Sequence, residues 1–211
     1  MKELYIIGAG DTGRSILGLI ERINQVKEEW QVCGYVDDNP ELEGKEVCGI
    51  PVVGKTDFLN STDREVYAVC TVCNGSLKRK LIESIHNPNV RYATLIDPSV
   101  AMCKGSSCGE GSFIFSNCSI SVFAEIRKHV YISYNSTIGH DTVVEDYCTI
   151  LPGTNISGKV TVGRETVAGT GTKVIQGKKI AAGCILGAGA VVVKDIEEAG
   201  TYVGVPVKKI K

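Results

Sequence analysis

The chain has 211 residues, enough for one large domain or two small ones. Its composition, 43% hydrophobic and 22% charged, is that of an ordinary globular protein, and its formal net charge of −1 argues against nucleic acid or an anionic membrane as a partner. No apolar run reaches the length that spans a bilayer, about 18 residues, and no leader pattern opens the chain, so we expect a cytoplasmic protein.

The first segment predicts a strand, a glycine turn and a helix. The sequence IIGAGDTGR, residues 6–14, follows apolar residues, and Gly8, Gly10 and Gly13 fit the pattern G-x-G-x-x-G. Such a turn places backbone N–H groups at a helix N-terminus, where a phosphate or another anion can bind. The pattern alone is weak evidence, because it also occurs in tight strand–helix turns that bind no ligand.

Residues 1–95 alternate between strand and helix patterns, which predicts a small parallel sheet in a Rossmann-like α/β domain. The expected strands are Leu4–Ile7, Val32–Val36, Val66–Val72 and Val90–Leu95, and the expected helices are Arg14–Lys27 and Ser76–His86. Asp37 and Asp38 follow the second strand, where a carboxylate can accept hydrogen bonds from a ribose or a base. Because these residues form only half of a dinucleotide fold, we do not expect NAD.

The nine cysteines do not predict a disulfide framework, because their number is odd and the chain is not small. Cys70 and Cys73 form the only C-x-x-C pair, inside an apolar run and without a second pair that would complete a zinc site. We therefore expect buried thiols that act as small hydrophobic side chains, and no metal.

From residue 102 onward the sequence repeats every six residues. Each sixth residue is apolar: Met102, Cys108, Ile114, Ile120, Ile126, Ile132, Ile138, Val144, Ile150, Ile156, Val162, Ala168, Val174, Ile180, Leu186 and Val192. From residue 106 onward, the residue two positions before each of these is small, with the exception of Lys178. Four of the nine cysteines occupy these repeat positions.

A period of six fits neither a helix nor simple strand alternation. It predicts short strands joined by corners, in an all-β parallel β-helix of hexapeptide repeats over residues 96–211. Three sides make about 18 residues per coil, so residues 18 apart stack at about the strand spacing of 4.8 Å. The segment LIDPSV, residues 95–100, is the expected junction with the first domain.

The chain has three histidines, His86, His129 and His140. His140 follows Gly139 in the segment IGHD, two residues after the repeat position Ile138. It is therefore expected near a corner, where its side chain can point outward.

These features together resemble one family. Hexapeptide repeats with IGHD in their middle, the ending VGVPVKKIK and an N-terminal domain with GAGDTG and VDDNP are similar to the bacterial sugar acyltransferases, a family of nucleotide-sugar N-acetyltransferases and sialic acid O-acetyltransferases. The resemblance covers nearly the whole chain. It implies a left-handed coil, a homotrimer, acetyl-CoA as acetyl donor bound between neighbouring copies, and an N-terminal domain that binds the nucleotide of a sugar acceptor.

The resemblance also implies roles for individual residues. His140 matches the catalytic base, and imidazole is suited to accept the proton of an attacking amine or hydroxyl; Asp141 matches the acidic residue that orients or tunes it. The positions matching the nucleotide-sugar site are Gly10, Asp11, Thr12, Asp37 and Asp38. The positions matching acetyl-CoA contacts are Thr149, Gly158, Thr170 and Ala188.

The 18-residue coil places these positions in two columns. Pro152, Thr170 and Ala188 fall in one column, and Val122, His140 and Gly158 fall in another. We expect the long pantetheine arm of the coenzyme to run along the coil axis and to touch both.

Three positions depart from the family pattern. Thr12 stands where a histidine is common in the nucleotide-sugar branch, Ser133 where an asparagine is common, and Thr149 where a second histidine contacts acetyl-CoA. The first two departures leave the acceptor open, so N-transfer to a nucleotide-linked amino sugar leads and O-transfer to sialic acid or another hydroxyl is the alternative.

Two other functions remain as alternatives. One is a zinc hydro-lyase with histidines shared across a trimer interface, but a catalytic all-histidine zinc needs three of them, and only His129 and His140 lie in the repeats. The other is a sugar-nucleotide-binding trimer without catalysis, against which the segment Gly139–Asp141 argues.

Overall fold

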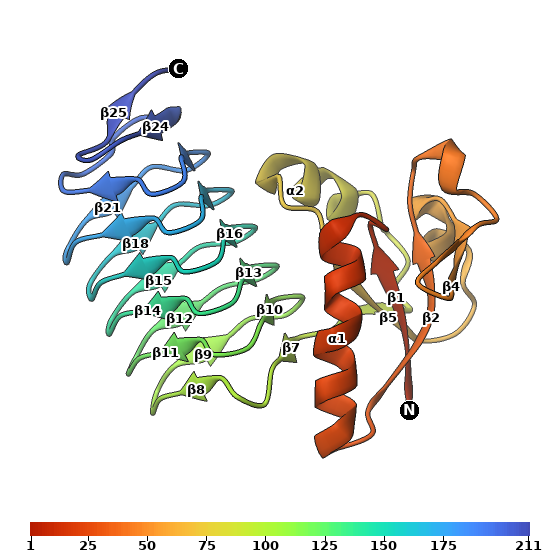
Figure 1. Ribbon diagram of the computed structural model, residues 1–211. Helices are drawn as coiled ribbons and strands as arrows, with labels where there is room; N and C mark the ends of the chain where they lie inside the picture. The colour runs from red at the N-terminus through yellow and green to blue at the C-terminus, as the bar shows by residue number, and fades with distance from the viewer.

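The structure, a computed structural model, describes all residues from Met1 to Lys211. Two parts of the chain lie side by side, an α/β domain and a stack of coils in which each turn of the chain lies on the one before (Figure 1). The prediction of an α/β domain followed by a parallel β-helix is confirmed. Neither helix has the length and apolarity needed to cross a membrane.

The α/β domain is built on a six-stranded sheet with the order β3-β4-β2-β1-β5-β6. The strands are β1 (Lys2–Ile7), β2 (Trp30–Val36), β3 (Glu46–Val47), β4 (Ile50–Gly54), β5 (Val66–Cys70) and β6 (Val90–Tyr92). The helices are α1 (Asp11–Val26) and α2 (Gly75–Glu83), and short 3-10 helices cover Pro40–Leu42 and Thr56–Ser61. All strand pairs are parallel except β3 with β4, so the glycine turn, between β1 and α1, lies at the carboxyl edge of a parallel sheet.

The β3–β4 hairpin is absent from the sequence prediction. Its two-residue turn is formed by Cys48 and Gly49, which have φ angles of 51° and 75°. Such turns need positive φ at both residues and are normally marked by Asn-Gly or Asp-Gly. Cysteine is not a turn signal, and the hairpin was missed for that reason.

From Leu95 to Val192 the coils of the β-helix have 18 residues each, because each strand pairs in parallel with the strand 18 residues further on, whereas Ile185 pairs with Thr201 at an offset of 16. The side that faces the α/β domain has β7 (Leu95–Ile96), β10 (Phe113–Ile114), β13 (Tyr131–Ile132), β16 (Thr149–Ile150), β19 (Val167–Ala168), β22 (Ile185–Leu186), β24 (Thr201–Val203) and β25 (Lys208–Lys209). The second side has β8 (Ala101–Met102), β11 (Ser119–Ile120), β14 (Thr137–Ile138), β17 (Asn155–Ile156), β20 (Lys173–Val174) and β23 (Val191–Val192). The third has β9 (Ser107–Cys108), β12 (Glu125–Ile126), β15 (Val143–Val144), β18 (Thr161–Val162) and β21 (Lys179–Ile180).

The apolar repeat forms the core of this β-helix. All sixteen positions are buried except Met102 and Cys108. These two lie in the first coil, below which no further coil covers them (Figure 1). The apolar repeat begins six residues earlier than predicted. Ile96 of β7 lies six residues before Met102 and packs against the same core.

The small residue two positions before each apolar repeat residue also has a hydrogen-bonding role. From Ser112 to Thr172, a hydroxyl or thiol at this position donates to the carbonyl oxygen 15 residues further along, as Thr142 does to Ser157 (2.9 Å) and Cys148 to Gly163 (3.2 Å). Each such bond gives a carbonyl oxygen of a corner a side-chain donor, which is favourable where water is excluded. Ser, Thr and Cys therefore suit a position that otherwise takes only small apolar residues.

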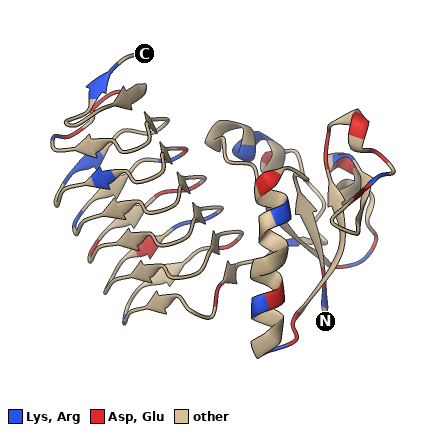
Figure 2. Cartoon of the chain, viewed as in Figure 1, with Lys and Arg blue, Asp and Glu red and all other residues tan.

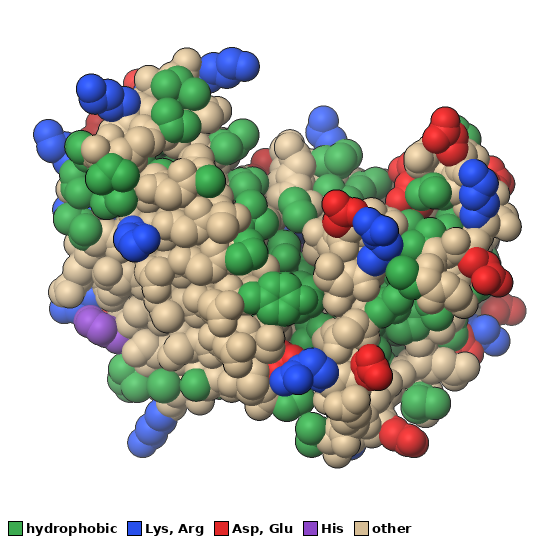
Figure 3. All heavy atoms as spheres, in the orientation of Figure 1, with side chains coloured by type: hydrophobic (Ala, Val, Ile, Leu, Met, Phe, Trp, Pro, Cys, Tyr) green, Lys and Arg blue, Asp and Glu red, His purple; other side chains and the backbone are tan.

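The predicted strand Val90–Leu95 is divided between the two parts. Its first residues form β6 of the α/β sheet, whereas Leu95 begins β7, which pairs with β10 of the β-helix. Phe113, Phe115 and Tyr131 share one apolar cluster with α1 and the α/β sheet, and hydrophobic side chains gather where the two parts meet (Figure 3). The parts are thus joined by a common core.

Candidate active site

His140 lies at the corner that joins β14 to β15. Its Nδ1 is 2.8 Å from Oδ2 of Asp141, and the two side chains are 43% and 49% exposed. Asp141 has a φ angle of 54°, the left-handed conformation that recurs every six residues from Gly105 to Gly189. Since a carboxylate only accepts hydrogen bonds, Nδ1 of a neutral ring carries the hydrogen, and the lone pair of Nε2 is left to accept a proton.

Gly158 lies against the imidazole ring of His140, from the next coil of the stack. A Cβ atom at this position would be 2.4 Å from Nε2 of His140, and a Cβ at Gly139 would be 2.4 Å from Gly158 N. Both distances are too short for real atoms, so the ring and its corner fit only against glycine. The position matched to an acetyl-CoA contact therefore also positions the candidate base.

The two predicted columns exist as stacked corners. Lys159 N donates to His140 O (2.8 Å), and Gly189 N donates to Thr170 O (2.8 Å). However, the columns lie at opposite ends of the side formed by β14, β17 and β20, about six residues or roughly 20 Å apart. One pantetheine arm along the axis therefore cannot touch both columns of the same chain, so the predicted contact with both columns requires a second copy.

Thr149 does not have the predicted environment either. Its side chain is fully buried between the β-helix and the α/β domain, where its hydroxyl donates to Cys73 O (2.7 Å) and accepts from Lys78 Nζ (3.2 Å). This burial contradicts the prediction that Thr149 contacts acetyl-CoA. Thr170 and Ala188 are exposed at their corner, as a ligand contact requires.

A second candidate site is a pocket at the carboxyl edge of the α/β sheet. It is lined by Ile7, Gly8, Val36, Asp37, Asp38, Thr56, Val72, Leu77 and Leu81. Asp37 accepts hydrogen bonds from Ala9 N (2.8 Å) and Asn39 N (2.9 Å), so both of its oxygens are occupied. Asp38 accepts from Thr56 N through Oδ1 (2.9 Å), and its second oxygen forms no hydrogen bond within the chain.

The glycine turn lies beside this pocket. A Cβ at Gly13 would be 2.0 Å from Gly8 O, so the close approach of α1 to β1 requires glycine. Gly10, Asp11 and Thr12 do not line the pocket: Gly10 caps α1, Asp11 pairs with Arg14, and the hydroxyl of Thr12 lies 3.3 Å from the thiol of Cys73. They lie beside the pocket, directly after the lining residue Gly8 and at the start of α1.

Several lining residues were not predicted from the sequence. Thr56 follows β4, whose hairpin the sequence did not reveal, and Leu77 and Leu81 lie four residues apart on α2. The spacing of the two leucines predicts one shared helix face. It does not tell whether that face is covered by core or opens into a pocket.

His129 and the buried cysteines have structural environments. His129 is packed between Tyr92, with ring centroids 4.7 Å apart, and Tyr147, at 5.3 Å. Burial lowers the pKa of its ring to about 4. All nine cysteines are free, burial raises the pKa of the Cys70 thiol to about 11, and no three His, Cys, Asp or Glu side chains cluster as metal ligands.

Within one chain, His140 and the pocket face different directions. The α/β domain covers the side formed by β10, β13 and β16, whereas His140 lies at the corner between the other two sides.

Comparisons with known proteins identify this combination. Residues 3–85 match the model of the PglD N-terminal domain. The chain is 30% identical over 182 residues to the GDP-perosamine N-acetyltransferase of Escherichia coli O157:H7, covering 83% of this chain and 79% of that protein. The chain belongs to the bacterial sugar N-acetyltransferase family.

Solved structures agree with this assignment. The acetyltransferase domain of PglB from Neisseria gonorrhoeae superposes with a TM-score of 0.88 at 25% identity, over 100% of both chains, and its complex with acetyl coenzyme A superposes with 0.87 at 27%, over 99% of both. PerB from Caulobacter crescentus, in complex with CoA and GDP-perosamine, gives 0.86 at 26% identity, over 100% of this chain and 98% of that one. As a sugar N-acetyltransferase of this fold, the protein has the left-handed β-helix that the resemblance implied.

Proposed function

We propose that the protein transfers the acetyl group of acetyl-CoA to the amino group of a nucleotide-linked amino sugar, with His140 as general base. The observation that carries this proposal is the pair of His140 and Asp141, with Nε2 held over Gly158 and without a hydrogen-bond partner in the chain. The Escherichia coli relative is named GDP-perosamine N-acetyltransferase, the PglB domain was solved with acetyl coenzyme A, and PerB was solved with CoA and GDP-perosamine. This favours N-transfer over O-transfer to a hydroxyl.

The chemistry follows from this geometry. The amine nitrogen of the acceptor attacks the thioester carbonyl carbon, a C–N bond forms, and Nε2 of His140 accepts the proton that the nitrogen loses. The C–S bond then breaks, and the sulfur leaves as CoA thiolate, which takes up a proton to give the free thiol. The carboxylate of Asp141 stabilises the imidazolium formed on the way and keeps Nδ1 as the donor.

The pocket of the α/β domain is the proposed nucleotide site. Its apolar walls can contact the flat base, and the free oxygen of Asp38 can accept a hydrogen bond from base or ribose. Gly10, Asp11 and Thr12 beside the pocket lie where the diphosphate would approach the N-terminus of α1. Asp37, whose oxygens hold Ala9 and Asn39, shapes this turn.

We propose that the working unit is a homotrimer. In one chain the nucleotide pocket and His140 face apart, so an acceptor held by one copy can reach the base only on another copy. Flat sides of a β-helix pack naturally against symmetric copies. Acetyl-CoA would lie between copies, against Gly158 of one and against Thr170 and Ala188 of the next, which resolves the separation of the two columns.

The charge of the later coils supports binding of the coenzyme. Residues 159–211 contain nine Lys and Arg against four Asp and Glu, a surplus of five positive charges (9 − 4). Lysines lie on β20, β21 and β25 (Figure 2), and Lys173 of β20 lies on the side between the two columns. Positive charge here attracts the phosphates of CoA.

We further propose a functional division near residue 95, with acceptor binding in residues 1–95 and acetyl transfer in residues 96–211, and a cytoplasmic location, which the nine free cysteines favour.

The test is a thiol-release assay with acetyl-CoA and a panel of GDP-, UDP-, dTDP- and CMP-linked amino sugars. We expect turnover with at least one of them, and a loss of kcat of about 10²–10⁴-fold in His140→Ala. The variant should still bind acetyl-CoA and keep its melting temperature, because His140 lies outside the buried core. Wild-type-like kcat in His140→Ala would rule out the base, and light scattering showing a monomer at micromolar concentration would rule out the trimer.

A further inference from the structure

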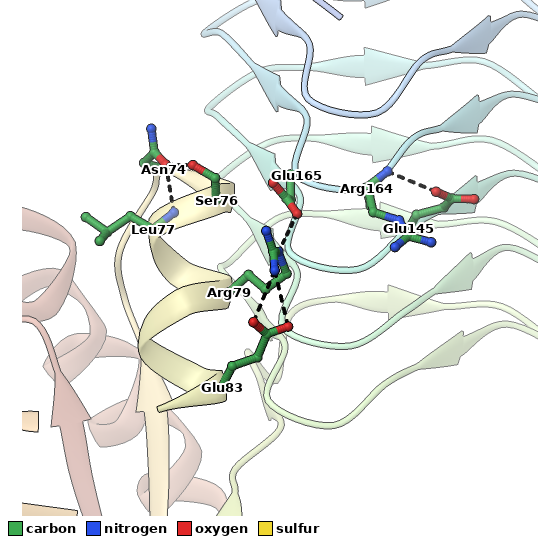
Figure 4. A network of polar contacts seen from close by, with 8 residues as sticks. All are labelled: Asn74, Ser76, Leu77, Arg79, Glu83, Glu145, Arg164 and Glu165. Carbon is green, nitrogen blue, oxygen red and sulfur yellow. Dashed lines mark hydrogen bonds and ion pairs between the residues drawn. The ribbon is translucent and has the colours of Figure 1, made fainter. Parts of the chain in front are cut away.

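Helix α2 has two faces with different neighbours. Leu77 and Leu81 line the nucleotide pocket. The opposite face packs on the β-helix, where a Cβ at Gly75 would be 2.6 Å from the Cα of Glu165, and Arg79 donates to Glu165 at 2.7 Å (Figure 4). The helix that forms a wall of the pocket is thus also the helix that docks on the coils.

Lys78 is the buried centre of this docking. Its side chain is 0% exposed, and its Nζ donates to His129 O (3.2 Å), Cys148 O (3.3 Å) and Thr149 Oγ1 (3.2 Å). An ammonium group has three N–H donors, so all are used. The acceptors lie on two successive coils, and none of them is a carboxylate.

Stability alone does not explain a lysine here. Taking an ammonium group out of water costs several kcal/mol, and an apolar side chain of similar length at such a site is often neutral or stabilising. Burial accordingly lowers the pKa of the Lys78 amine. What three directed hydrogen bonds supply, and an apolar side chain does not, is a single orientation of α2 on the coils.

The same contacts continue into the glycine turn. Thr149, which accepts from Lys78, donates to Cys73 O (2.7 Å), and the thiol of Cys73 lies 3.3 Å from the hydroxyl of Thr12. Nearby, the hydroxyl of Thr71 donates to Gly8 O (3.0 Å). Hydrogen bonds therefore link the coils through Cys73 to Thr12 at the start of α1, and Thr71 holds the pocket-lining Gly8 beside them.

We infer that Lys78 and Thr149 are positioning residues for the acceptor, which hold the nucleotide pocket in one orientation on the β-helix. They touch no substrate. Since α2 is also a wall of the pocket, this orientation decides how tightly the pocket binds the nucleotide sugar, so the inference rests on the proposed function. The donor site lies on the coils alone and does not depend on it.

The test is steady-state kinetics of Lys78→Met, with Lys80→Met as matched control. Lys80 carries the same side chain on the same helix but is exposed. We expect Lys78→Met to raise the KM of the nucleotide sugar about tenfold, the effect of about one lost hydrogen bond to a charged group. The KM of acetyl-CoA and the melting temperature should stay at wild-type values, and Lys80→Met should change none of these.

A second variant covers the case that Lys78→Met does not fold. Thr149→Val keeps the volume but removes the link to Cys73, and it should raise the acceptor KM in the same way, by about threefold. An unchanged acceptor KM in the folded variants, or equal rises for acceptor and acetyl-CoA, would overturn the inference.

Failure of the proposed function can be told apart from failure of this inference. If the wild-type protein shows no turnover with any nucleotide sugar, the proposed function fails, and calorimetric titration with GDP and UDP still tests the orientation of the pocket. Weaker binding of the nucleoside diphosphate to Lys78→Met than to Lys80→Met would support the inference, and equal binding would contradict it.

Discussion

The two parts of this molecule solve the problem of placing a functional side chain in different ways. In the β-helix, the six-residue repeat determines which residues lie in the core, at corners and facing outward. The corner position of His140 therefore follows from its place two residues after the core residue Ile138. In the α/β domain, the pocket is assembled from the ends of three strands, a 3-10 helix and α2, which lie far apart in the sequence. The position of a functional side chain can therefore be predicted from a repeat, but not where a site is formed by segments that are far apart in the sequence.

The largest effect that tests this contrast concerns the core of the repeat. Ile150 is fully buried between coils, whereas Met102, at the same repeat position in the first coil, is 36% exposed. Ile150→Ala should lower the free energy of unfolding by about 2–5 kcal/mol, because it leaves a cavity. Met102→Ala should cost less than about 1 kcal/mol, because coils interact only with their neighbours and the first coil has one. Denaturant unfolding measures both.

Equal losses in the two variants would break the comparison, since they would show that the position in the stack does not matter. A melting transition that splits in two for Ile150→Ala would sharpen it, because it would show that the coils on either side unfold separately.

The next effect concerns the catalytic corner. Gly158→Ala places a methyl carbon 2.4 Å from Nε2 of His140, so the imidazole must shift while Ile138 and Ile156 stay in place. A displacement of about 1 Å of a reacting group costs about 10²-fold in rate, and we expect a loss of that order in kcat. Gly18→Ala is the control, because a Cβ there meets nothing within 4 Å. If Gly158→Ala kept the wild-type kcat, the ring would not need its present position.

The same contrast explains what sequence reasoning could predict. The β-helix, its 18-residue coil and the outward corner of His140 followed from spacing, because stacking imposes one register on every coil. Thr149 matches a family position that contacts the coenzyme. The spacing of the repeat cannot show that α2 covers the side of the β-helix on which Thr149 lies. The hairpin at Cys48 was missed because its turn lacks the usual residues, and Thr56 of the pocket was missed with it.

Asp37 and Asp38 illustrate a finer limit. Their place after β2 was predictable, and both line the pocket. Which carboxylate keeps a free oxygen depends on the backbone of Ala9, Asn39 and Thr56, and on the hairpin that brings Thr56 close. Such a partition of roles between adjacent acids is set by tertiary structure.

The smallest predicted effect tests the boundary between the two parts. His129 is 5% exposed between Tyr92 of the α/β domain and Tyr147 of the β-helix, and its Nδ1 has no hydrogen-bond partner. The pKa of the folded ring is lowered to about 4, mainly by burial and partly by the charge of Lys78, against the opposing effect of Glu110. In the unfolded chain the pKa is about 6.5.

Between these two values the unfolded chain binds a proton that the folded protein does not, so the free energy of unfolding falls as the pH falls. The contribution of His129 is fully present above pH about 6.5, and we expect a loss of about 2 kcal/mol between pH 7 and pH 5. His129→Phe keeps an aromatic ring at the site and removes the titration. Denaturant unfolding of both proteins at the two pH values isolates the effect, because the carboxylates titrate alike in each. If the variant lost as much stability as the wild type over this range, His129 would not be held neutral, and the two parts would not be closed around it.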